Sequence, residues 1–336
     1  MPSGDEPAVP PTASPRARPF TICRADEAVP PAIAGAIAAI GNFDGVHLGH
    51  RALIAAVRET ARAAGRPAVA LTFEPHPRAY FAPQLPMFRL TDAGGKEIVF
   101  AHLGLDGLIV RRFDARLAGT GARDFVAGLL VRDLGVAGVV IGHDFHFGRG
   151  REGTPSVLAA LCAEAGLSCR IIPPVALSAE AAPISSSAIR AALAEGAIAR
   201  ANALLGYRWF VAGEVRHGDK RGRTLGYPTA NVALADCGLA HGIYAVRVRL
   251  PDGTVKDGVA SYGRRPTFDD GAPLLEVNLF DFAGDLYGQA IAVEFLGYIR
   301  GEVRFDGAEA LIAQMHDDAA EAVSYTHLTL PTNSLV

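Results

Sequence analysis

Apolar and polar residues follow one pattern in the first part of the chain and another in the second. Between about residues 20 and 196, short continuous apolar runs alternate with stretches whose apolar residues recur at helical spacing. The apolar runs lie at residues 36–40, 68–73, 108–110 and 138–142, and the helical stretches include 51–57 and 122–134. Near-continuous apolar strands joined by helices predict an α/β domain built on a doubly wound parallel sheet.

From residue 209 onward, β-rich segments follow one another without long helical stretches between them. Turn signals such as Pro251-Asp252-Gly253 separate these segments, and several alternate apolar and polar residues. The predicted strands lie at residues 209–215, 243–250, 275–279 and 291–295. Consecutive strands without crossover helices predict an antiparallel sheet closed into a small β-barrel. A terminal helix is predicted at 308–321.

These patterns divide the chain into two domains and two ends. A length of 336 residues suits about two domains. We expect residues 20–200 to form the sheet domain and 207–323 the barrel, with one helix at 191–205 leading to the junction. Residues 1–19 are rich in Pro, Ala and Ser and are expected to be disordered. Residues 324–336 are unlike a native terminus and are expected to be a non-native tail.

Composition narrows the class of protein. The net charge of −3 argues against a large nucleic-acid surface. The four cysteines form no CxxC pair, which fits a reducing cytosol. The longest apolar stretch is too short to cross a bilayer. We therefore expect a cytoplasmic protein without nucleic-acid or membrane partners, and its composition is compatible with a homo-oligomer.

The segment Gly41–His50 carries the first candidate chemistry. It joins an apolar strand to a helix through a turn that contains Gly41, Gly45 and Gly49. Glycines let the backbone approach a ligand, and a helix start offers free N–H groups to an anion. His47 and His50 can reach the same anion, so the segment favours a phosphate site. The alternatives are that the histidines only cap the helix and that Asp44 is a turn residue; a zinc site lacks a third ligand.

Other polar motifs follow strands of the same domain. Thr72–Pro77 contains two prolines and predicts a rigid loop. Asp144 follows the 138–142 strand, where an acidic side chain can touch ribose, phosphate or a metal. Ile184–Arg190 places three serines and an arginine at a helix start, more hydroxyl groups than a helix cap requires.

The barrel half carries a second candidate site. Gly218–Asn231 is a basic, glycine-rich segment that ends in a hydroxyl and an amide, Thr229 and Asn231. Such a loop can wrap phosphates and supply magnesium ligands, and a mobile hairpin loop is the alternative. Glu276 lies mid-strand, where alternation alone predicts a solvent-facing residue.

Together these motifs resemble the prokaryotic bifunctional riboflavin kinase/FMN adenylyltransferases, or FAD synthetases. The HxGH signature, the TFxPHP loop, the ISSTxIR motif and the GxxLGxPTAN string of that family all have counterparts here, in the family's order. The resemblance covers about Phe20 to Ala322. His146 stands where the family usually has Arg, and Ser187 where it has Thr.

The resemblance implies that ATP phosphorylates riboflavin to FMN in the barrel and that a second ATP adenylylates FMN to FAD in the sheet domain. It implies catalytic roles for Glu276 as general base, for His47 and His50 on the ATP phosphates, and for Arg190 on the leaving pyrophosphate. The implied nucleotide-binding residues are Gly41, Asn42, Phe43, Asp44, Gly45, Gly49, Asp144, Ser185, Ser186, Ser187, Gly222, Gly226, Thr229 and Asn231. The implied flavin-binding residues are Phe73, Pro75, His76 and Arg300. Thr229 and Asn231 would hold Mg²⁺ with ATP.

Other functions remain open at this stage. One module could have become regulatory in a single-activity protein, or the chain could bind flavin without catalysis. A nucleotidyltransferase with a different acceptor would leave the barrel without a role. A catalytic function is favoured over flavin binding alone by the joint presence of Thr229, Asn231 and Glu276, because binding a flavin needs no base.

Overall fold

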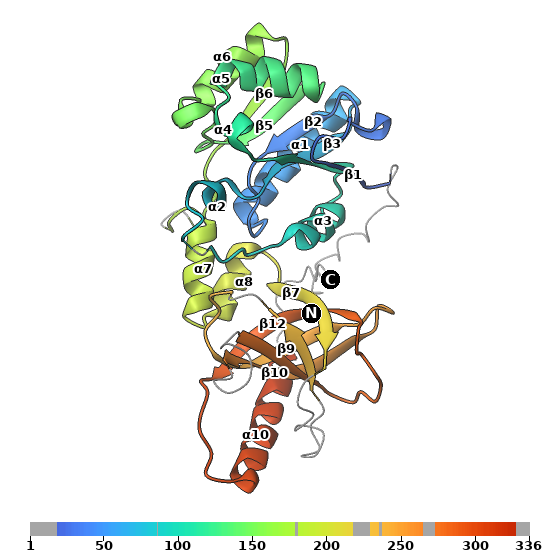
Figure 1. Ribbon diagram of the computed structural model, residues 1–336, viewed down its shortest axis with the longest axis vertical. Helices are drawn as coiled ribbons and strands as arrows, with labels where there is room; N and C mark the ends of the chain where they lie inside the picture. Colours follow the sequence, from blue (N-terminus) through green and yellow to red (C-terminus); the bar gives the residue numbers. More distant parts are fainter. Residues whose placement is uncertain are drawn as a thin grey trace, which may run out of the picture.

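The computed structural model describes residues 19–85, 87–178, 181–217, 229–234, 237–264 and 273–326. A sheet domain and a barrel are stacked along the long axis of the molecule, and helices α7 and α8 lie between them (Figure 1). This arrangement confirms the predicted α/β sheet domain followed by an antiparallel barrel and a terminal helix.

The first domain contains a six-stranded sheet in the order β1-β4-β3-β2-β5-β6, and all its neighbouring strands run parallel. Its strands are β1 (Thr21–Arg24), β2 (Ile37–Ile40), β3 (Ala68–Glu74), β4 (Gly107–Arg112), β5 (Gly138–Gly142) and β6 (Ser168–Ile172). The central strands match the apolar runs of the sequence. The edge strands β1 and β6 are partly exposed and lack such a run, so the pattern did not predict them.

Helices cover both faces of this sheet. The helices before the junction are α1 (Leu48–Ala64), α2 (Pro77–Phe81), α3 (Ala93–His102), α4 (Ala115–Ala118), α5 (Ala122–Asp124) and α6 (Pro155–Glu164), with 3₁₀ turns at Pro31–Ile33 and Arg149–Arg151. The helices between the two domains are α7 (Ser186–Ala194) and α8 (Ile198–Leu205). Buried residues of α1 and α3 pack on one face, and those of α6 and of a π-helical segment, Phe125–Asp133, pack on the other. The connections after β2 and β5 therefore leave toward opposite faces, which makes this pair the switch point of the sheet.

Two predicted helices differ in detail. The helix expected at 191–205 is wrong as a single element, because Gly196 adopts φ +71° and divides it into α7 and α8. The left-handed conformation at this glycine ends the first helix. The helix expected at 122–134 begins as α5 and continues as the π-helical segment.

The second domain is a closed antiparallel barrel in the order β10-β11-β8-β7-β12-β9. Its strands are β7 (Phe210–Arg216), β8 (Ala230–Ala233), β9 (Gly242–Arg249), β10 (Val255–Arg264), β11 (Pro273–Leu279) and β12 (Ala290–Arg300). β8 and β10 were not predicted; β10 contains Lys256, Asp257 and two glycines, which weaken its strand pattern.

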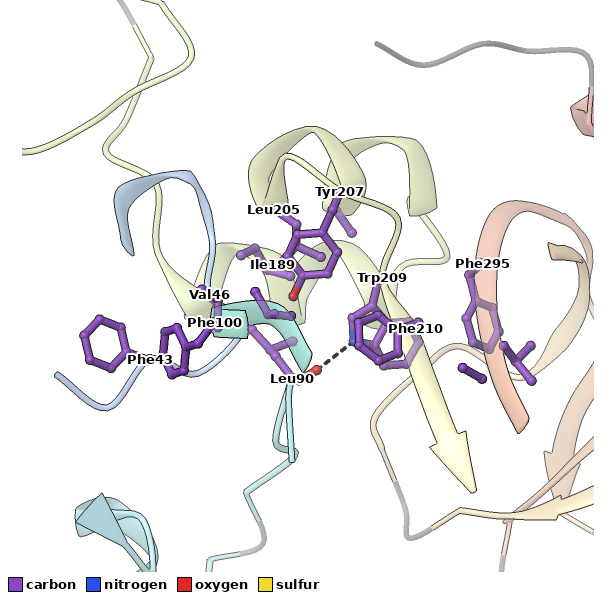
Figure 2. Packing of buried hydrophobic residues seen from close by; sticks show 14 of the residues in the cluster. Phe43, Val46, Leu90, Phe100, Ile189, Leu205, Tyr207, Trp209, Phe210 and Phe295 are labelled. Atoms are coloured by element: carbon purple, nitrogen blue, oxygen red, sulfur yellow. Dashed lines mark hydrogen bonds between the residues drawn. The ribbon is translucent and has the colours of Figure 1, made fainter. Parts of the chain in front are cut away.

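The cores of the two domains are continuous. One cluster of buried side chains extends from the sheet through α7 and α8 into the barrel. Figure 2 shows Tyr207, Trp209 and Phe210 between the sheet-domain residue Leu90 and the barrel residue Phe295. Trp209 is 1% exposed, and its ring lies 5.0 Å from that of Phe295 and 5.8 Å from that of Phe88, measured between centroids. The junction is therefore a packed layer of aromatic residues.

A bidentate ion pair attaches the terminal helix α10 (Ala308–Thr326) to the barrel. Arg300, at the end of β12, donates from Nε and Nη2 to the two carboxylate oxygens of Asp318 at 2.7 and 2.6 Å. Asp318 is buried, and its Oδ1 also accepts from Gln314 at 3.0 Å. The helix continues through Thr326, so the first three residues of the expected tail belong to it, whereas 327–336 and 1–18 lie outside the described residues.

We expect Asp318→Asn to destabilise the barrel. The substitution leaves the Arg300 guanidinium without its carboxylate and should lower the free energy of unfolding by about 1–3 kcal/mol. Urea denaturation would measure the loss. Asp317→Asn, at the exposed neighbouring position of the same helix, is the matched control and should behave like the wild type. Equal stabilities of the two variants would show that the ion pair contributes nothing.

Candidate active sites

The Gly41–His50 turn lies at the switch point, between the end of β2 and the start of α1. Its backbone is unusual: Phe43, Gly45 and Val46 have φ values of +51°, +85° and +37°. A Cβ on Gly45 would lie 2.9 Å from a Leu90 methyl group, so glycine is required there both for conformation and for space. The side chains of Phe43 and Val46 are fully buried, so only backbone atoms at these positions can face a ligand.

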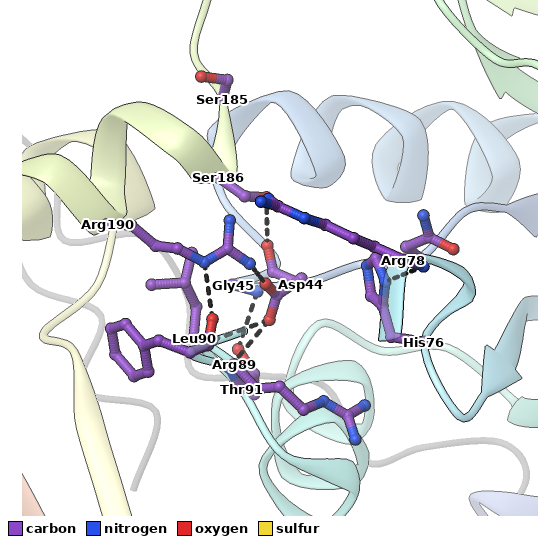
Figure 3. Close-up of polar contacts among 12 residues, drawn as sticks. Asp44, Gly45, His76, Arg78, Arg89, Leu90, Thr91, Ser185, Ser186 and Arg190 are labelled. Atoms are coloured by element: carbon purple, nitrogen blue, oxygen red, sulfur yellow. Dashed lines mark hydrogen bonds and ion pairs between the residues drawn. The ribbon is translucent and has the colours of Figure 1, made fainter. Parts of the chain in front are cut away.

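Asp44 is the buried anchor of this turn rather than a simple turn residue. Its Oδ1 accepts from the backbone N–H groups of Leu90 and Thr91 at 2.9 and 3.3 Å. Its Oδ2 forms an ion pair with Arg190 Nη2, and its backbone carbonyl accepts from Ser186 Oγ at 2.8 Å. Figure 3 shows two segments distant in sequence, Leu90–Thr91 and the start of α7, converging on Asp44.

The two histidines lie together at the start of α1. Their rings stack with centroids 3.7 Å apart, and His47 caps the helix by accepting the His50 backbone N–H at Nδ1. Burial lowers the pKa of His47 to about 4, opposed by the charge of Asp144. Burial, followed by His47 and Lys96, lowers the pKa of His50 well below its usual value. Both rings are thus neutral at pH 7, and each can offer an N–H group to a phosphate.

His50 also carries an unusual buried atom. Its Nδ1 is buried and has no hydrogen-bond partner within the described part of the chain. Such orphaned polar atoms are rare in folded proteins and costly to keep. The predicted capping role and the predicted phosphate role are therefore not exclusive, because His47 caps the helix while the ring of His50 retains unused hydrogen-bonding capacity.

The three serines of the Ile184–Arg190 motif have different environments in the structure. Ser185 caps α7 by accepting the Ala188 N–H at 3.2 Å, and Ser186 binds the Asp44 carbonyl. Ser187 is exposed. Arg190, one turn into α7, donates from Nε to the Phe88 carbonyl at 2.6 Å in addition to its ion pair with Asp44. These two contacts fix the guanidinium beside the Gly41–His50 turn. They use Nε and Nη2 and leave Nη1.

The loop predicted at Thr72–Pro77 is shorter in the structure, because Thr72–Glu74 complete β3 and Pro77 begins α2, which leaves Pro75 and His76 between them. The peptide bond between Glu74 and Pro75 is cis. His76 caps α2 by accepting the Arg78 N–H at 3.1 Å, and burial lowers its pKa to about 4. The ring of Phe73 is buried among aromatic residues on the α6 side of the sheet, 6.3 Å from Phe113.

A charged cluster at this loop was missed in the sequence. Lys96 is 1% exposed and donates to Glu74 Oε1 at 3.1 Å, and Arg89 pairs with the same oxygen. Burial lowers the pKa of Lys96, opposed by Glu74. Lys96 lies three and four residues before the buried Val99 and Phe100 of α3, and this helical spacing is the signal that could have placed it on the inner face.

The second candidate site is on the barrel, where β8 and β11 run side by side. Asn231 and Glu276 are directly opposite each other in this pair, and Val232 and Leu275 beside them point into the core. Asn231 is buried, and its Oδ1 has no hydrogen-bond partner among the described residues. A hard, neutral oxygen of this kind suits Mg²⁺, so the residues present fit the predicted metal.

A cavity of about 400 Å³ opens beside this pair of strands. Its lining includes Thr229, Asn231, Phe282 and Tyr287. The ring of Tyr287 lies 3.8 Å from that of His217, which follows β7. Gly222 and Gly226, predicted to bind nucleotide, lie outside the described residues.

Arg300, predicted to bind the flavin, is bound to Asp318, so its side chain holds helix α10 in this structure.

Comparisons with known proteins identify the family. The family model described as FAD synthetase matches residues 30–188, and that described as riboflavin kinase matches 205–326. The chain is 40% identical to the bifunctional riboflavin kinase/FMN adenylyltransferase of Escherichia coli strain K12 over 298 residues, covering 88% of this chain and 95% of that protein. The chain belongs to the bifunctional riboflavin kinase/FMN adenylyltransferase family.

Other relatives span comparable lengths. The family member of Bacillus subtilis strain 168 is 37% identical over 299 residues, which cover 87% of this chain and 94% of the relative. A crystal structure from Streptococcus pneumoniae, titled as a macrolide-efflux protein, has 30% identity and a TM-score of 0.79 and covers 92% of this chain and 99% of its own. Within the described residues, no helix has the length and hydropathy needed to cross a bilayer.

Because the two histidines are buried and neutral, we expect the free energy of unfolding to decrease as the pH falls. Because the folded pKa of His47, about 4, lies below its unfolded value of 6.5, the unfolded chain takes up the proton first as the pH falls. The free energy of unfolding should therefore decrease between pH 6.5 and 4, by on the order of 3 kcal/mol for this residue. Urea titrations followed by the fluorescence of Trp209, the one tryptophan, would measure it.

His47→Asn tests the assignment. This variant should lose less stability than the wild type between pH 7 and pH 5, because it lacks the titrating ring. His146→Asn, at an exposed position, should retain the wild-type dependence. If His47→Asn has the same pH dependence as the wild type, the ring is not held neutral.

Proposed function

We propose that this riboflavin kinase/FMN adenylyltransferase divides its two reactions between its two domains. Residues 207–323 transfer the γ-phosphoryl group of ATP to riboflavin and make FMN. Residues 20–200 then transfer AMP from a second ATP to FMN, making FAD and pyrophosphate. The stacked, neutral histidine pair at the switch point, beside Asp144 and at a helix start, is the observation that carries the adenylyl-transfer assignment.

In the adenylyl step, a phosphate oxygen of FMN attacks the α-phosphorus of ATP, and pyrophosphate leaves with the bonding electrons. No covalent enzyme intermediate is required, so the task of the site is to hold two anions in line and to offset the developing charge. His47 and His50 donate N–H groups to the α/β-phosphates, together with the free N–H groups at the start of α1. Arg190, already fixed beside Asp44, presents its remaining nitrogen to the leaving pyrophosphate.

The remaining predicted residues surround this centre. Gly41, Asn42 and Gly49 provide close backbone approach, and Asp144 at the end of β5 faces the nucleotide. Ser185 and Ser187 hold phosphate oxygens. Pro75 and His76, in the loop after β3, contact the flavin. The position of this loop beside β2 in the sheet supports the assignment, because ligands of such sheets bind beyond the carboxyl ends of the strands.

In the kinase step, Glu276 accepts the proton of the terminal ribityl hydroxyl as its oxygen attacks the γ-phosphorus. Thr229 and Asn231 hold Mg²⁺ with ATP, and the metal supplies positive charge to the phosphates when it is bound. The placement of Glu276 directly across from Asn231 supports this assignment, because it brings the base next to the predicted metal ligand.

We also propose a cytoplasmic location, consistent with four free cysteines.

Removing the histidine pair should separate the activities. His47→Ala combined with His50→Ala should abolish FAD formation while FMN still accumulates from riboflavin, since the barrel has its own ATP site. Incubation with riboflavin, ATP and Mg²⁺ followed by chromatographic separation of the flavins measures both products. His316→Ala, on an exposed position of α10, is the control and should make FAD normally. FAD synthesis by the double variant would remove the histidines from the mechanism.

Replacing the proposed base should give the opposite result. Glu276→Gln keeps the size of the side chain but cannot accept the proton, so FMN formation should fall by about 10²–10⁴-fold. Supplied FMN should still be converted to FAD at the wild-type rate. Glu309→Gln, exposed on α10, is the matched control. A kinase rate close to the wild type in Glu276→Gln would show that this residue is not the base.

A further inference from the structure

Residues 205–210, here called the junction segment, connect the two domains and are almost completely buried. Leu205, Tyr207, Trp209 and Phe210 are 0%, 4%, 1% and 7% exposed. They belong to the core cluster shared by sheet and barrel (Figure 2). A connection that served only as a tether would need none of this burial.

The junction segment holds the Gly41–His50 turn directly. The Tyr207 hydroxyl donates to the Gly45 carbonyl at 2.7 Å. Arg51, in the first turn of α1, donates from Nη1 to the Gly206 carbonyl at 2.6 Å. A Cβ on Gly45 would lie 3.4 Å from a Leu205 methyl group, so the two chains are in close contact at this point.

The same segment also holds the strip of chain that binds Asp44. Trp209 donates from Nε1 to the Leu90 carbonyl at 2.9 Å, while the Leu90 N–H donates to Asp44. Thr91 accepts the Gly45 N–H at 3.0 Å. Tyr207 therefore binds the strained turn itself, and Trp209 binds the Leu90–Thr91 strip that holds the turn from its other side.

On its other side the junction segment is bound to the barrel. Phe295 of β12 donates its N–H to the Trp209 carbonyl at 2.9 Å. Asn202 of α8 accepts the Trp209 N–H at 2.7 Å and donates to the Phe295 carbonyl at 2.9 Å. The position of the segment thus depends on the barrel as well as on α8.

Backbone in the left-handed region persists at non-glycine residues only where surrounding contacts enforce it. Phe43 and Val46 are such residues, on either side of Gly45. We propose that Tyr207 is a positioning residue for adenylyl transfer, which holds the Gly45 carbonyl and so sets the turn that presents His47 and His50. Through Tyr207 the docked barrel is part of the first site's geometry. This inference rests on the proposed function of that turn.

Tyr207→Phe in the full-length chain tests the proposal, because it removes only the hydroxyl. With FMN supplied, the KM for ATP in adenylyl transfer should rise about 5- to 10-fold, the cost of a buried carbonyl without its partner. The KM and kcat of riboflavin phosphorylation should not change. Thr91→Val, which removes the acceptor of the Gly45 N–H, should have the same effect, and the double variant should show less than the sum of the two.

Tyr244→Phe is the matched control, a buried tyrosine of β9 whose hydroxyl donates to the carbonyl of Ala240, in the segment just before the same strand. It should leave adenylyl transfer from supplied FMN unchanged. An unchanged KM for ATP in Tyr207→Phe overturns the proposal, as does a parallel loss of both activities with a lower melting temperature. The histidine double variant separates the two hypotheses: if it still makes FAD, the proposed function fails, and if it does not while Tyr207→Phe is normal, only the positioning role fails.

Discussion

The Asp44 carboxylate is the contact on which the first site depends. It is buried, and it is satisfied by two backbone N–H groups from the Leu90–Thr91 strip and by Arg190 of α7. A buried charge is tolerated only when it is paired and hydrogen-bonded, so each of these segments must be in place before the turn can form. The same pairing fixes the Arg190 guanidinium beside Asp44, within the Gly41–His50 turn. The polar groups of this turn are thus positioned by long-range contacts and not by the local turn alone.

The second site is built differently. Asn231 and Glu276 are neighbours because strands β8 and β11 are aligned in register, so the barrel's hydrogen-bond ladder alone sets their separation. A slip of one strand by one residue would place the two side chains on opposite faces of the sheet. The histidine turn is held by contacts from distant segments, while the strand pair is held by its neighbouring strands. The two candidate sites therefore rely on two different ways of positioning polar groups.

Much of this organisation could be predicted from local sequence. The apolar runs gave the central strands, and the glycines with His47 and His50 gave the turn at the end of β2, because burial and backbone freedom leave local signals. The features that could not be predicted are contacts between residues that are far apart in the sequence. Asp44 looked like a turn residue because Leu90 and Arg190 are far away in sequence, and the Glu74–Lys96 pair gave no motif. The split of the 191–205 helix at Gly196 was a local signal that was overlooked.

The continuous aromatic layer at the junction bears on how such a chain can change over evolution. Two domains joined by an exposed linker can be recombined freely with other partners. Here Tyr207, Trp209 and Phe210 belong to one core cluster shared by both halves, and Asn202 of α8 accepts the Trp209 N–H. A sheet domain joined to the barrel of another protein would bury mismatched surfaces against its own Gly41–His50 turn. The two halves of this protein can therefore change only together at this layer.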